Sequence, residues 1–555
     1  MKARKGDGLY FLPLGGSGEI GMNLNLIGYG PAHHPRWLMI DCGVTFGDES
    51  VPGIDLIMGD PTFIAERNED LLGLVLTHAH EDHIGAVPYL WPKLQCPVYA
   101  TPFTGHLVVE KLKEVGLQGR VPLHIVPLGG TIELGPFGIE LVTLTHSIPE
   151  PNALAIRTPL GTLLHTGDWK IDPDPLVGEV TDEAALRKLG DEGVLAMICD
   201  STNVFSPGRS GSEATVRESL IELIGTLRGR IAVTAFASNV ARLESVAHAA
   251  AAHGRHVVLV GRSMQRVVAA AKASGYLTDM ADFIDERDAG WLPPETVLYL
   301  CTGSQGEPRA ALSRIASGTH PNVTLEAGDT VIFSSRIIPG NEREIFAVQS
   351  QLAARGIEVM TEHDHLVHVS GHPCRDELAD MYRWVRPKIA VPVHGELRHL
   401  VEHEAFARSL QVPQALFAPN GSMMQLAPGP AAIIDEVPHG RLYRDGLNLF
   451  RDGYEALRER RKLAIAGVVN AVLVLNKKGR LAAEPAISLH GVAVPDAEEM
   501  SATLRDIVDD VIEREVGRAW ADDDFIAEMT RRALRKAIVK AAGVKPEAKV
   551  QIVRV

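Results

Sequence analysis

His78-Ala79-His80-Glu81-Asp82-His83 is the stretch of this sequence that decides its fold and its chemistry. It follows directly on the apolar run 72–77, which has the composition of a buried strand. A tight loop that leaves a strand can direct several side chains to one point, and imidazole and carboxylate groups are common ligands of divalent metal ions. The spacing predicts that His78 and His80 bind one metal ion and that Asp82 and His83 bind a second.

Three further residues of the same chemical types stand where later apolar runs end. His146, Asp168 and His394 each follow directly on a strand-like run. In a β-rich scaffold, strands bring such residues from distant parts of the chain to one rim. We therefore expect these three residues to join the first cluster.

The order of these residues resembles the signature of the metallo-β-lactamase fold: His-x-His-x-Asp-His, then a histidine, then an aspartate in a Thr-Gly-Asp context. Three segments also resemble the motifs of its β-CASP branch, which acts on nucleic acids; they contain Asp200 (198–203), His368 (368–372) and His394 (392–396). Within that branch, the opening segment 12–21 and Pro339-Gly340-Asn341-Glu342 are similar to the bacterial ribonuclease J family. The similarity extends from residue 8 to the C-terminus.

The resemblance implies an α/β fold: a metallo-β-lactamase αββα sandwich with an inserted β-CASP parallel α/β domain and a small C-terminal α+β domain. The residues themselves also indicate an insertion, because ligand candidates lie on both sides of a long stretch in which strands and helices alternate. Strands are predicted at 231–234, 257–260, 297–300 and 330–333, and helices at 212–227, 237–253 and 263–274.

The chain has 555 residues, too many for one hydrophobic core, and the patterns divide it into five parts. Residues 1–208 and 366–428 are expected to form the two portions of the metallo-β-lactamase domain, and residues 209–365 the inserted domain. Residues 429–463 contain proline and glycine and then a highly charged run, so they are expected to form a linker. Residues 464–555 are expected to form the C-terminal domain.

The C-terminal domain is expected to contain strands at 468–475 and 486–490, two amphipathic helices at 497–516 and 522–542, and a last strand at 549–555. It holds no recognisable group of catalytic residues. A module of about ninety residues buries the apolar faces of both helices only with difficulty. We therefore expect this domain to mediate assembly into a homodimer or a homotetramer.

Composition restricts where the protein acts. The five cysteines are scattered without a C-x-x-C pair, which is typical of reduced thiols in the cytoplasm. No apolar run approaches the length of a membrane span, and the basic N-terminus lacks the apolar segment of a secretion signal. We expect a cytoplasmic protein that does not associate with membranes.

The net charge of −15 opposes a simple nucleic-acid binder, because a basic surface supplies most non-specific affinity for RNA. An RNA enzyme with this charge balance must concentrate its positive charge in a groove. The candidates for that groove are Lys170, Arg209, Arg262, Arg266, Arg336 and Arg343, of which Arg262, Arg266 and Arg336 are the predicted RNA contacts.

Residues 16–21, Gly-Ser-Gly-Glu-Ile-Gly, fit the dinucleotide fingerprint G-x-G-x-x-G, and Asp41 follows at about the expected distance of twenty residues. In a dinucleotide fold a helix must follow these glycines, since its N-terminus binds the pyrophosphate. Here residues 23–28 alternate like a strand. The glycines are therefore predicted to form a hairpin turn near the site, and Asp41 to orient a ligand histidine from behind.

The resemblance implies a centre with two divalent metal ions per chain. His78, His80 and His146 would hold the first ion, Asp82, His83 and His394 the second, and Asp168 would bridge the two. Histidine-rich ligation favours zinc, while the carboxylates also admit manganese or magnesium. The ions would activate a water molecule for in-line attack on phosphorus.

Three residues are predicted to act catalytically beside the metals. Asp82 would take the proton of the attacking water as a secondary role. His368 would face the leaving oxygen or a non-bridging oxygen of the phosphate as a hydrogen-bond donor. Asp200 would orient a ligand or His368 without reacting itself.

The segment Ser370-Gly371-His372 is predicted to contact RNA phosphates, because a glycine between hydroxyl and imidazole groups presents several donors together. The resemblance implies a 5′-to-3′ exonuclease that favours 5′-monophosphate ends and also cleaves internally. It would act in RNA maturation, including that of rRNA, and in mRNA decay, with RNA-decay proteins as partners. Pro373 and Cys374 depart from the family's small Ala and Ser, which predicts fewer phosphate contacts.

Three other functions compete with an RNA-cleaving enzyme. A β-CASP nuclease acting on DNA would use the same residues, because only the 2′-OH separates RNA from DNA locally. A small-ester hydrolase on the same scaffold would not need an inserted domain to hold a polymer. A non-catalytic RNA-binding subunit would be expected to have lost ligands, and all seven candidates are present.

Overall fold

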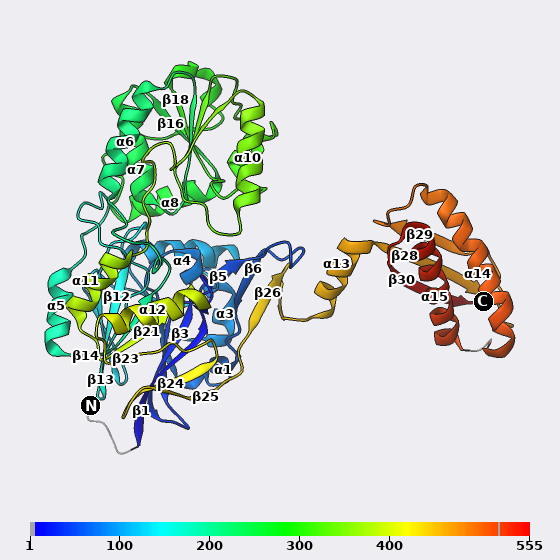
Figure 1. The fold of residues 1–555 in the computed structure, drawn as a ribbon, viewed down its shortest axis with the longest axis horizontal. Coiled ribbons are helices and arrows are strands. Elements are labelled where there is room, and N and C mark those ends of the chain that lie inside the picture. The colour runs from blue at the N-terminus through cyan, green and yellow to red at the C-terminus, as the bar shows by residue number, and fades with distance from the viewer. Residues whose placement is uncertain (1–5, 520–521) are drawn as a thin grey trace. The chain divides into compact units, whose positions relative to one another are not determined.

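The computed structural model describes residues 6–519 and 522–555, which form two compact units (Figure 1). Met1–Thr45 and Met58–Arg441 make up the first unit, and Phe46–Ile57 and Leu442–Val555 make up the second. Each helix among the described residues is too short or too polar to traverse a bilayer.

Two β-sheets form the centre of the first unit. The first sheet has the order β25-β24-β1-β3-β4-β7-β8-β9. Its strands are β1 (Asp7–Gly15), β3 (Leu24–Pro31), β4 (Arg36–Ile40), β7 (Leu71–Val75), β8 (Val98–Ala100), β9 (Leu123–Ile125), β24 (Ser422–Ala427) and β25 (Ala432–Glu436). The second sheet has the order β10-β11-β12-β13-β14-β21-β23. Its strands are β10 (Thr131–Leu134), β11 (Phe137–Thr143), β12 (Asn152–Thr158), β13 (Gly161–His165), β14 (Val194–Asp200), β21 (Ile389–Val393) and β23 (Gln414–Ala415).

The two sheets pack face to face because both present apolar side chains. One core contains Leu9 and Ile27 from the first sheet together with Ile139 and Ile156 from the second. Helices α5 (Glu183–Glu192), α11 (Arg375–Val385) and α12 (Leu397–Ser409) cover the outer face of the second sheet, and α4 (Pro102–Glu114) packs on β8 and β9 of the first. The predicted αββα sandwich is confirmed.

The inserted domain is built on a fully parallel sheet. The sheet order is β17-β16-β18-β15-β19-β20. Figure 1 shows helices α6 (Glu213–Thr226) and α7 (Val240–Ala252) on one side of this sheet and α10 (Glu342–Ala354) on the other. The strands are β15 (Ile231–Thr234), β16 (His256–Val260), β17 (Ile284–Asp285), β18 (Val297–Cys301), β19 (Thr330–Phe333) and β20 (Glu358–Met360). The predicted strand–helix alternation is confirmed, with ends that differ by a few residues.

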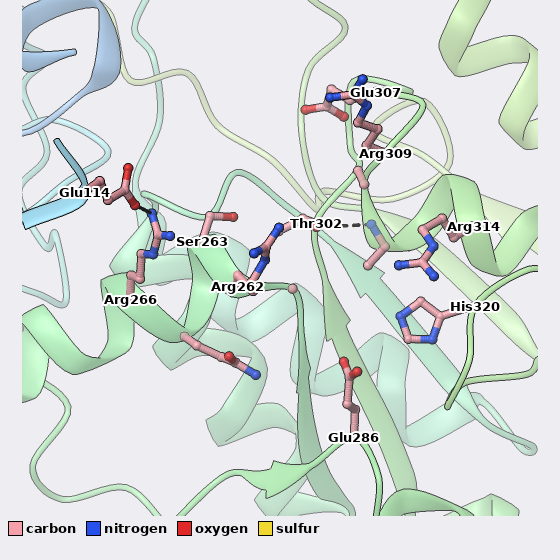
Figure 2. A pocket seen from close by; sticks show the side chains of 14 residues that line it. Glu114, Arg262, Ser263, Arg266, Glu286, Thr302, Glu307, Arg309, Arg314 and His320 are labelled. Atoms are coloured by element: carbon pink, nitrogen blue, oxygen red, sulfur yellow. Dashed lines mark hydrogen bonds and ion pairs between the residues drawn. The ribbon is translucent and has the colours of Figure 1, made fainter. Parts of the chain in front are cut away.

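An open cavity of about 710 Å³ lies at the carboxyl ends of β16 and β18 (Figure 2). Gly261 and Arg262 follow β16 and Thr302 follows β18, and Arg262 begins helix α8 (Arg262–Ala273). In open parallel sheets, this edge is where ligands usually bind.

The second unit contains a small α+β domain. Its three-stranded sheet has the order β29-β28-β30, formed by β28 (Val468–Leu475), β29 (Ala486–His490) and β30 (Glu547–Arg554). Helices α14 (Ala497–Ala519) and α15 (Asp523–Ala542) pack on this sheet, and Leu504, Val508, Leu534 and Ile538 lie in the common core. The elements predicted for the C-terminal domain are therefore present in the predicted order.

The stretch 429–463, expected to be a linker, carries regular structure. It contains β25, β26 (Arg441–Asp445), β27 (Asn448–Arg451) and most of helix α13 (Glu455–Ala466). Its charged run is held by specific partners: Arg460 pairs with Asp445 at 2.8 Å, and Arg461 donates to the Ser50 carbonyl at 2.6 Å. The charged run suggested a solvated linker, but two of its arginines form an ion pair and a hydrogen bond with specific partners.

Candidate metal centre

The predicted ligands come together at the ends of strands from both sheets of the first unit. His78 to His83 follow β7, His146 follows β11, Asp168 follows β13 and His394 follows β21. The ligand atoms form overlapping groups whose members lie within 4.8 Å of one another. Two of these groups are His78, His80, His146 and Asp168, and Asp82, His83, Asp168 and His394. Asp168 belongs to both, as expected of a bridging carboxylate.

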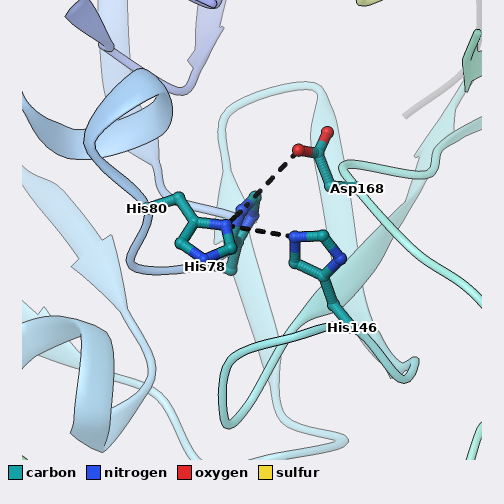
Figure 3. Close-up of side chains that lie close together, drawn as sticks. All are labelled: His78, His80, His146 and Asp168. Atoms are coloured by element: carbon teal, nitrogen blue, oxygen red, sulfur yellow. Dashed lines mark hydrogen bonds and ion pairs between the residues drawn. The ribbon is translucent and has the colours of Figure 1, made fainter. Parts of the chain in front are cut away.

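In the first group, nitrogen atoms of three imidazole side chains face one another beside a carboxylate (Figure 3). His80 Nδ1 lies 3.1 Å from His78 Nε2 and 3.1 Å from His146 Nε2, and Asp168 Oδ2 lies 3.9 Å from His78 Nε2. His146 Nδ1 donates to the Gly371 carbonyl at 2.5 Å, which leaves its Nε2 as a lone-pair donor facing the group. Three converging imidazole nitrogens and a carboxylate fit a divalent cation.

The second group is organised around His83. Its Nε2 lies 3.1 Å from Asp168 Oδ2 and 3.4 Å from Asp82 Oδ2, and His394 Nε2 lies 3.4 Å from the same Asp168 oxygen. On the other side of the ring, His83 Nδ1 donates to Asp41 Oδ2 at 2.7 Å. Asp41 is fixed in turn by the Thr77 amide at 2.8 Å. The structure therefore places Asp41 behind a candidate ligand histidine, where its carboxylate sets the tautomer and orientation of the ring.

The ionisation of the first group, His78, His80, His146 and Asp168, suits metal binding. Burial lowers the pKa of His78 and His146 well below the ordinary value and that of His80 to about 4. Burial alone would raise the pKa of Asp168, but the neighbouring His394 and His83 hold it well below its usual range. Neutral imidazoles and ionised carboxylates are the forms that bind metals.

Asn23 also belongs to this centre, although no pattern in the sequence singled it out. Its Oδ1 accepts from His394 Nδ1 at 3.0 Å, and its Nδ2 donates to the Asp82 carbonyl at 3.1 Å. It follows the glycine segment 16–21, which connects the antiparallel strands β1 and β3. The predicted hairpin is confirmed, and the His394 amide donates to the Gly16 carbonyl at 2.7 Å.

The structure brings His372, and not His368, to the candidate metal ligands, which corrects the assignment of His368. His372 forms a third group of possible ligands with Asp168, Asp200 and His394. Its ring centroid lies 5.1 Å from that of His146 and 5.6 Å from that of His394. His368 belongs to none of the ligand groups found among the described residues, and burial and the neighbouring Arg242 lower its pKa well below the ordinary value.

Asp200 orients the histidine that reaches the centre. Its Oδ2 accepts from His372 Nδ1 at 2.8 Å, while its Oδ1 accepts from the amide and the hydroxyl of Thr202 at 2.8 and 2.7 Å. Burial alone would lower the pKa of His372, but Asp200 raises it to about 9. Asp200 therefore has the orienting role that was predicted for it, and the residue that it orients is His372.

We call Ser370-Gly371-His372 the phosphate-contact segment, and each of its three residues forms a hydrogen bond with another part of the chain. The Ser370 hydroxyl accepts from Asn203 Nδ2 at 2.7 Å, and the Gly371 carbonyl accepts from His146. Cys374 is buried and stands directly before helix α11, with its amide bonded to Glu377 Oε2 at 2.8 Å. The amide of Cys374 is therefore committed to capping this helix.

The basic residues proposed for RNA contact divide into two sets. Arg262 and Arg266 line the open cavity of the inserted domain together with Arg309 and Arg314, which the sequence analysis did not select (Figure 2). Arg266 pairs with Glu114 at 2.5 Å; the ion pairs of the described residues include none of the other three. Arg336 lies near His368 and helps to lower its pKa.

Two of the candidate cations, Lys170 and Arg209, are committed to structural pairs. Lys170 is fully buried and pairs with Asp172 at 2.8 Å, and Arg209 pairs with Asp380 at 2.5 Å. A buried ammonium cannot meet an RNA backbone, which corrects the choice of Lys170.

Family models match most of the chain, from residue 29 to its C-terminus with a gap at 412–454. Residues 29–225 match the metallo-beta-lactamase superfamily, and residues 228–352 match the beta-CASP domain of ribonuclease J. Residues 356–411 match the Zn-dependent metallo-hydrolase RNA specificity domain, and residues 455–555 match the ribonuclease J C-terminal domain.

Whole-chain relatives agree with these models. A ribonuclease J from Sinorhizobium meliloti is 47% identical over 99% of this chain and 97% of its own. One from Mycolicibacterium smegmatis is 40% identical over 97% of this chain and 95% of its own. A crystal structure of a protein of unknown function from Enterococcus faecalis V583 shares the fold, with a TM-score of 0.51 and 15% identity over 75% of this chain and 100% of that one.

Proposed function

This chain belongs to the ribonuclease J family, and from that membership and the geometry of its metal centre we propose that it degrades RNA from the 5′ end and also cleaves internally. It is a metal-dependent ribonuclease, and RNA is its substrate. The single observation that carries the proposal is the pair of ligand groups sharing Asp168, with the His372–Asp200 pair beside them. The biological setting we propose is the maturation and decay of cytoplasmic RNA.

We assign the two ligand groups to two divalent ions, with zinc as the first choice and manganese or magnesium as alternatives. His78, His80 and His146 offer three imidazole nitrogens to one position, and Asp82, His83 and His394 surround the other. The chemistry that these residues would gain from bound ions is the activation of a water molecule and the neutralisation of negative charge on the phosphate.

The chain's own residues then position and assist the substrate. Asp82 is 30% exposed, more than its neighbours His83, Asp168 and His394, so water can reach its carboxylate at the mouth of the centre, where we assign it the secondary role of taking the proton. His372 donates a hydrogen bond to a phosphate oxygen while Asp200 holds its Nδ1. Ser370 and Gly371 bring the backbone of the same segment to the phosphate.

Paired digestions test the direction of cleavage. One RNA is prepared with a 5′-monophosphate or a 5′-triphosphate, labelled at either end, and digested with zinc or manganese present. We expect mononucleotides from the 5′ end of the monophosphate RNA, slower attack on the triphosphate RNA, and internal fragments from both. Equal rates with internal fragments alone would remove the 5′-end proposal.

A DNA-directed nuclease is the second candidate, because the ligand groups carry no residue assigned to a 2′-OH. Single-stranded DNA of the same sequence belongs in the same assay. The family membership favours RNA, and we expect the DNA to be degraded far more slowly. A non-catalytic RNA-binding subunit is disfavoured by the complete set of seven ligand candidates.

We propose that the protein assembles as a homodimer or a homotetramer in which the C-terminal domain takes part. Side chains such as Phe525 and Val539 on α15 and Val553 on β30 remain more than one-third exposed in the single chain. Sedimentation of the full chain and of a chain ending at residue 460 tests this. We expect the shortened chain to lose assembly, and a shortened chain with the full-length oligomeric state would contradict the role of this domain.

A further inference from the structure

Arg242 forms a fully buried ion pair in the inserted domain. It lies on α7, and its side chain is 0% exposed, as against 2% for its partner Glu213, the first residue of α6. The contact is bidentate: Nη2 donates to both carboxylate oxygens of Glu213 at 3.0 and 3.1 Å, and Nε donates to one of them at 3.3 Å. Two helices of the inserted domain are thereby joined.

The remaining nitrogen of Arg242 contacts the residue that precedes the segment 368–372. Nη1 donates to the carbonyl and the hydroxyl of Ser334, which follows β19, at 2.9 and 2.6 Å. It also donates to the Val367 carbonyl at 2.7 Å. Val367 directly precedes the segment 368–372, so one guanidinium connects α6, α7, the end of β19 and the start of that segment.

The segment 368–372 is held at its other end by the metallo-β-lactamase domain. Its Gly371 carbonyl accepts from His146, and its His372 donates to Asp200 at 2.8 Å. The position of His372 therefore depends on two anchors, one in each domain. Arg242 is the charged member of the anchor in the inserted domain.

Stability alone does not account for this ion pair. A buried pair pays a large desolvation cost, and apolar residues of similar volume often replace it without loss of stability. What arginine supplies is a planar fork with five donors in fixed directions, which lysine cannot reproduce. At this position, the fork satisfies a carboxylate and two backbone carbonyls at once.

A second buried pair continues the connection into the metal-binding strands. The Glu213 amide donates to Asp172 Oδ2 at 2.9 Å, and Asp172 pairs with Lys170 at 2.8 Å. Lys170 lies two residues after Asp168, and its amide donates to the Thr145 carbonyl, next to His146. The same network thus reaches both the segment 368–372 and the loop that carries the shared ligand.

We propose that Arg242 is a positioning residue for catalysis: through the Val367 carbonyl it sets where His372 and the phosphate-contact segment lie relative to the metal ligands. The role rests on the proposed function, since it concerns the same centre. A misplacement of about 1 Å can cost about 100-fold in rate. Loss of Arg242 should therefore lower kcat while the metal ligands remain intact.

The deciding variant is the double replacement Arg242→Met with Glu213→Met, which removes both buried charges and leaves neither stranded. We expect this protein to fold, to melt near the wild-type temperature and to bind the wild-type amount of metal. Its kcat on 5′-monophosphate RNA should fall about 10- to 100-fold, with KM changed much less. A merely structural role predicts wild-type kcat, because the fold is retained.

Arg242→Lys provides a second, independent variant if the double replacement does not fold. It keeps a positive charge beside Glu213 but cannot also reach the Val367 carbonyl with the same geometry. We expect this variant to retain the wild-type metal content and to have a kcat below that of the wild type, as the double variant does. Recovery of wild-type kcat by lysine would show that charge alone is needed and would overturn the proposal.

Arg255 is the matched control, because it is a buried arginine of the same domain that donates to backbone carbonyls. Its contacts to Leu227 and Gly229, at 2.8 Å each, lie at the amino ends of the strands, away from the segment 368–372. Arg255→Met should lower the melting temperature without changing kcat per folded enzyme.

The outcomes separate failure of this inference from failure of the proposed function. If the wild-type protein with bound metal does not cleave RNA, the proposed function fails. If the wild type cleaves RNA and the folded, metal-loaded double variant keeps kcat within about threefold, the positioning role of Arg242 is refuted. An equal loss of kcat in Arg255→Met would also refute it.

Discussion

Asp168→Ala is expected to abolish RNA cleavage and to reduce bound metal in the same protein. Asp168 is common to all three groups of possible ligands, with its Oδ2 3.1 Å from His83 Nε2 and 3.4 Å from His394 Nε2. Its removal deletes the one carboxylate that would be shared by both ion positions and leaves the remaining imidazoles facing one another. We expect activity to fall by more than about 10⁴-fold, beyond the range of a single acid–base group.

The measurements are metal content per chain, rate on 5′-monophosphate RNA and melting temperature. The wild type should approach two ions per chain, and exhaustive chelation should reproduce the loss of activity. Asp174→Ala is a matched control, since Asp174 is an exposed carboxylate a few residues farther along the same loop. An Asp168→Ala protein that kept two ions and its activity would contradict the metal assignment. His80→Ala should likewise lose both bound metal and activity.

His372→Ala is expected to lower the rate by about 10²- to 10⁴-fold while metal content stays near that of the wild type. The reason is its place: its Nδ1 is held by Asp200, and its ring lies beside His146 and His394. The seven assigned ligands remain in this variant. RNA affinity should change little, because many phosphate contacts share it.

His368→Ala is the companion of that experiment, because both histidines belong to the same five-residue segment. His368 lies outside the ligand groups of the described residues, so its loss should lower kcat by less than about tenfold. If His368→Ala lost more activity than His372→Ala at equal metal content, the assignment of His368 to the phosphate would have to be restored. If His372→Ala lost metal as Asp168→Ala does, His372 would be a ligand.

Local sequence patterns determined the secondary structure and the identity of the candidate metal ligands. The strands at 231–234 and 330–333 begin and end where the sequence analysis placed them, because apolar runs between breakers leave few alternatives. His78 to His83 cluster because they leave one strand together. The alternation after Asn23 excluded a dinucleotide turn for the same local reason.

Contacts between distant residues decided what the sequence left open. Two histidines four residues apart, His368 and His372, are equivalent in a pattern, and only the folded segment shows which one faces Asp200. Asn23 joins the centre through contacts to residues 59 and 371 positions away. The full burial of Lys170 likewise depends on distant residues, since its Nζ donates to the Gly211 carbonyl at 3.1 Å, 41 positions away.

Chemical type and spacing are properties of the chain, so the sequence by itself determined the fold class, the order of the domains and the seven candidate ligands. The direction of each side chain depends on which buried groups surround it, and those groups come from other strands and from the inserted domain. The tertiary structure alone therefore decided that His372 reaches the metal centre and that Arg242 holds the start of its segment. In both cases hydrogen bonds between residues far apart in sequence fix the position, and no local pattern encodes them.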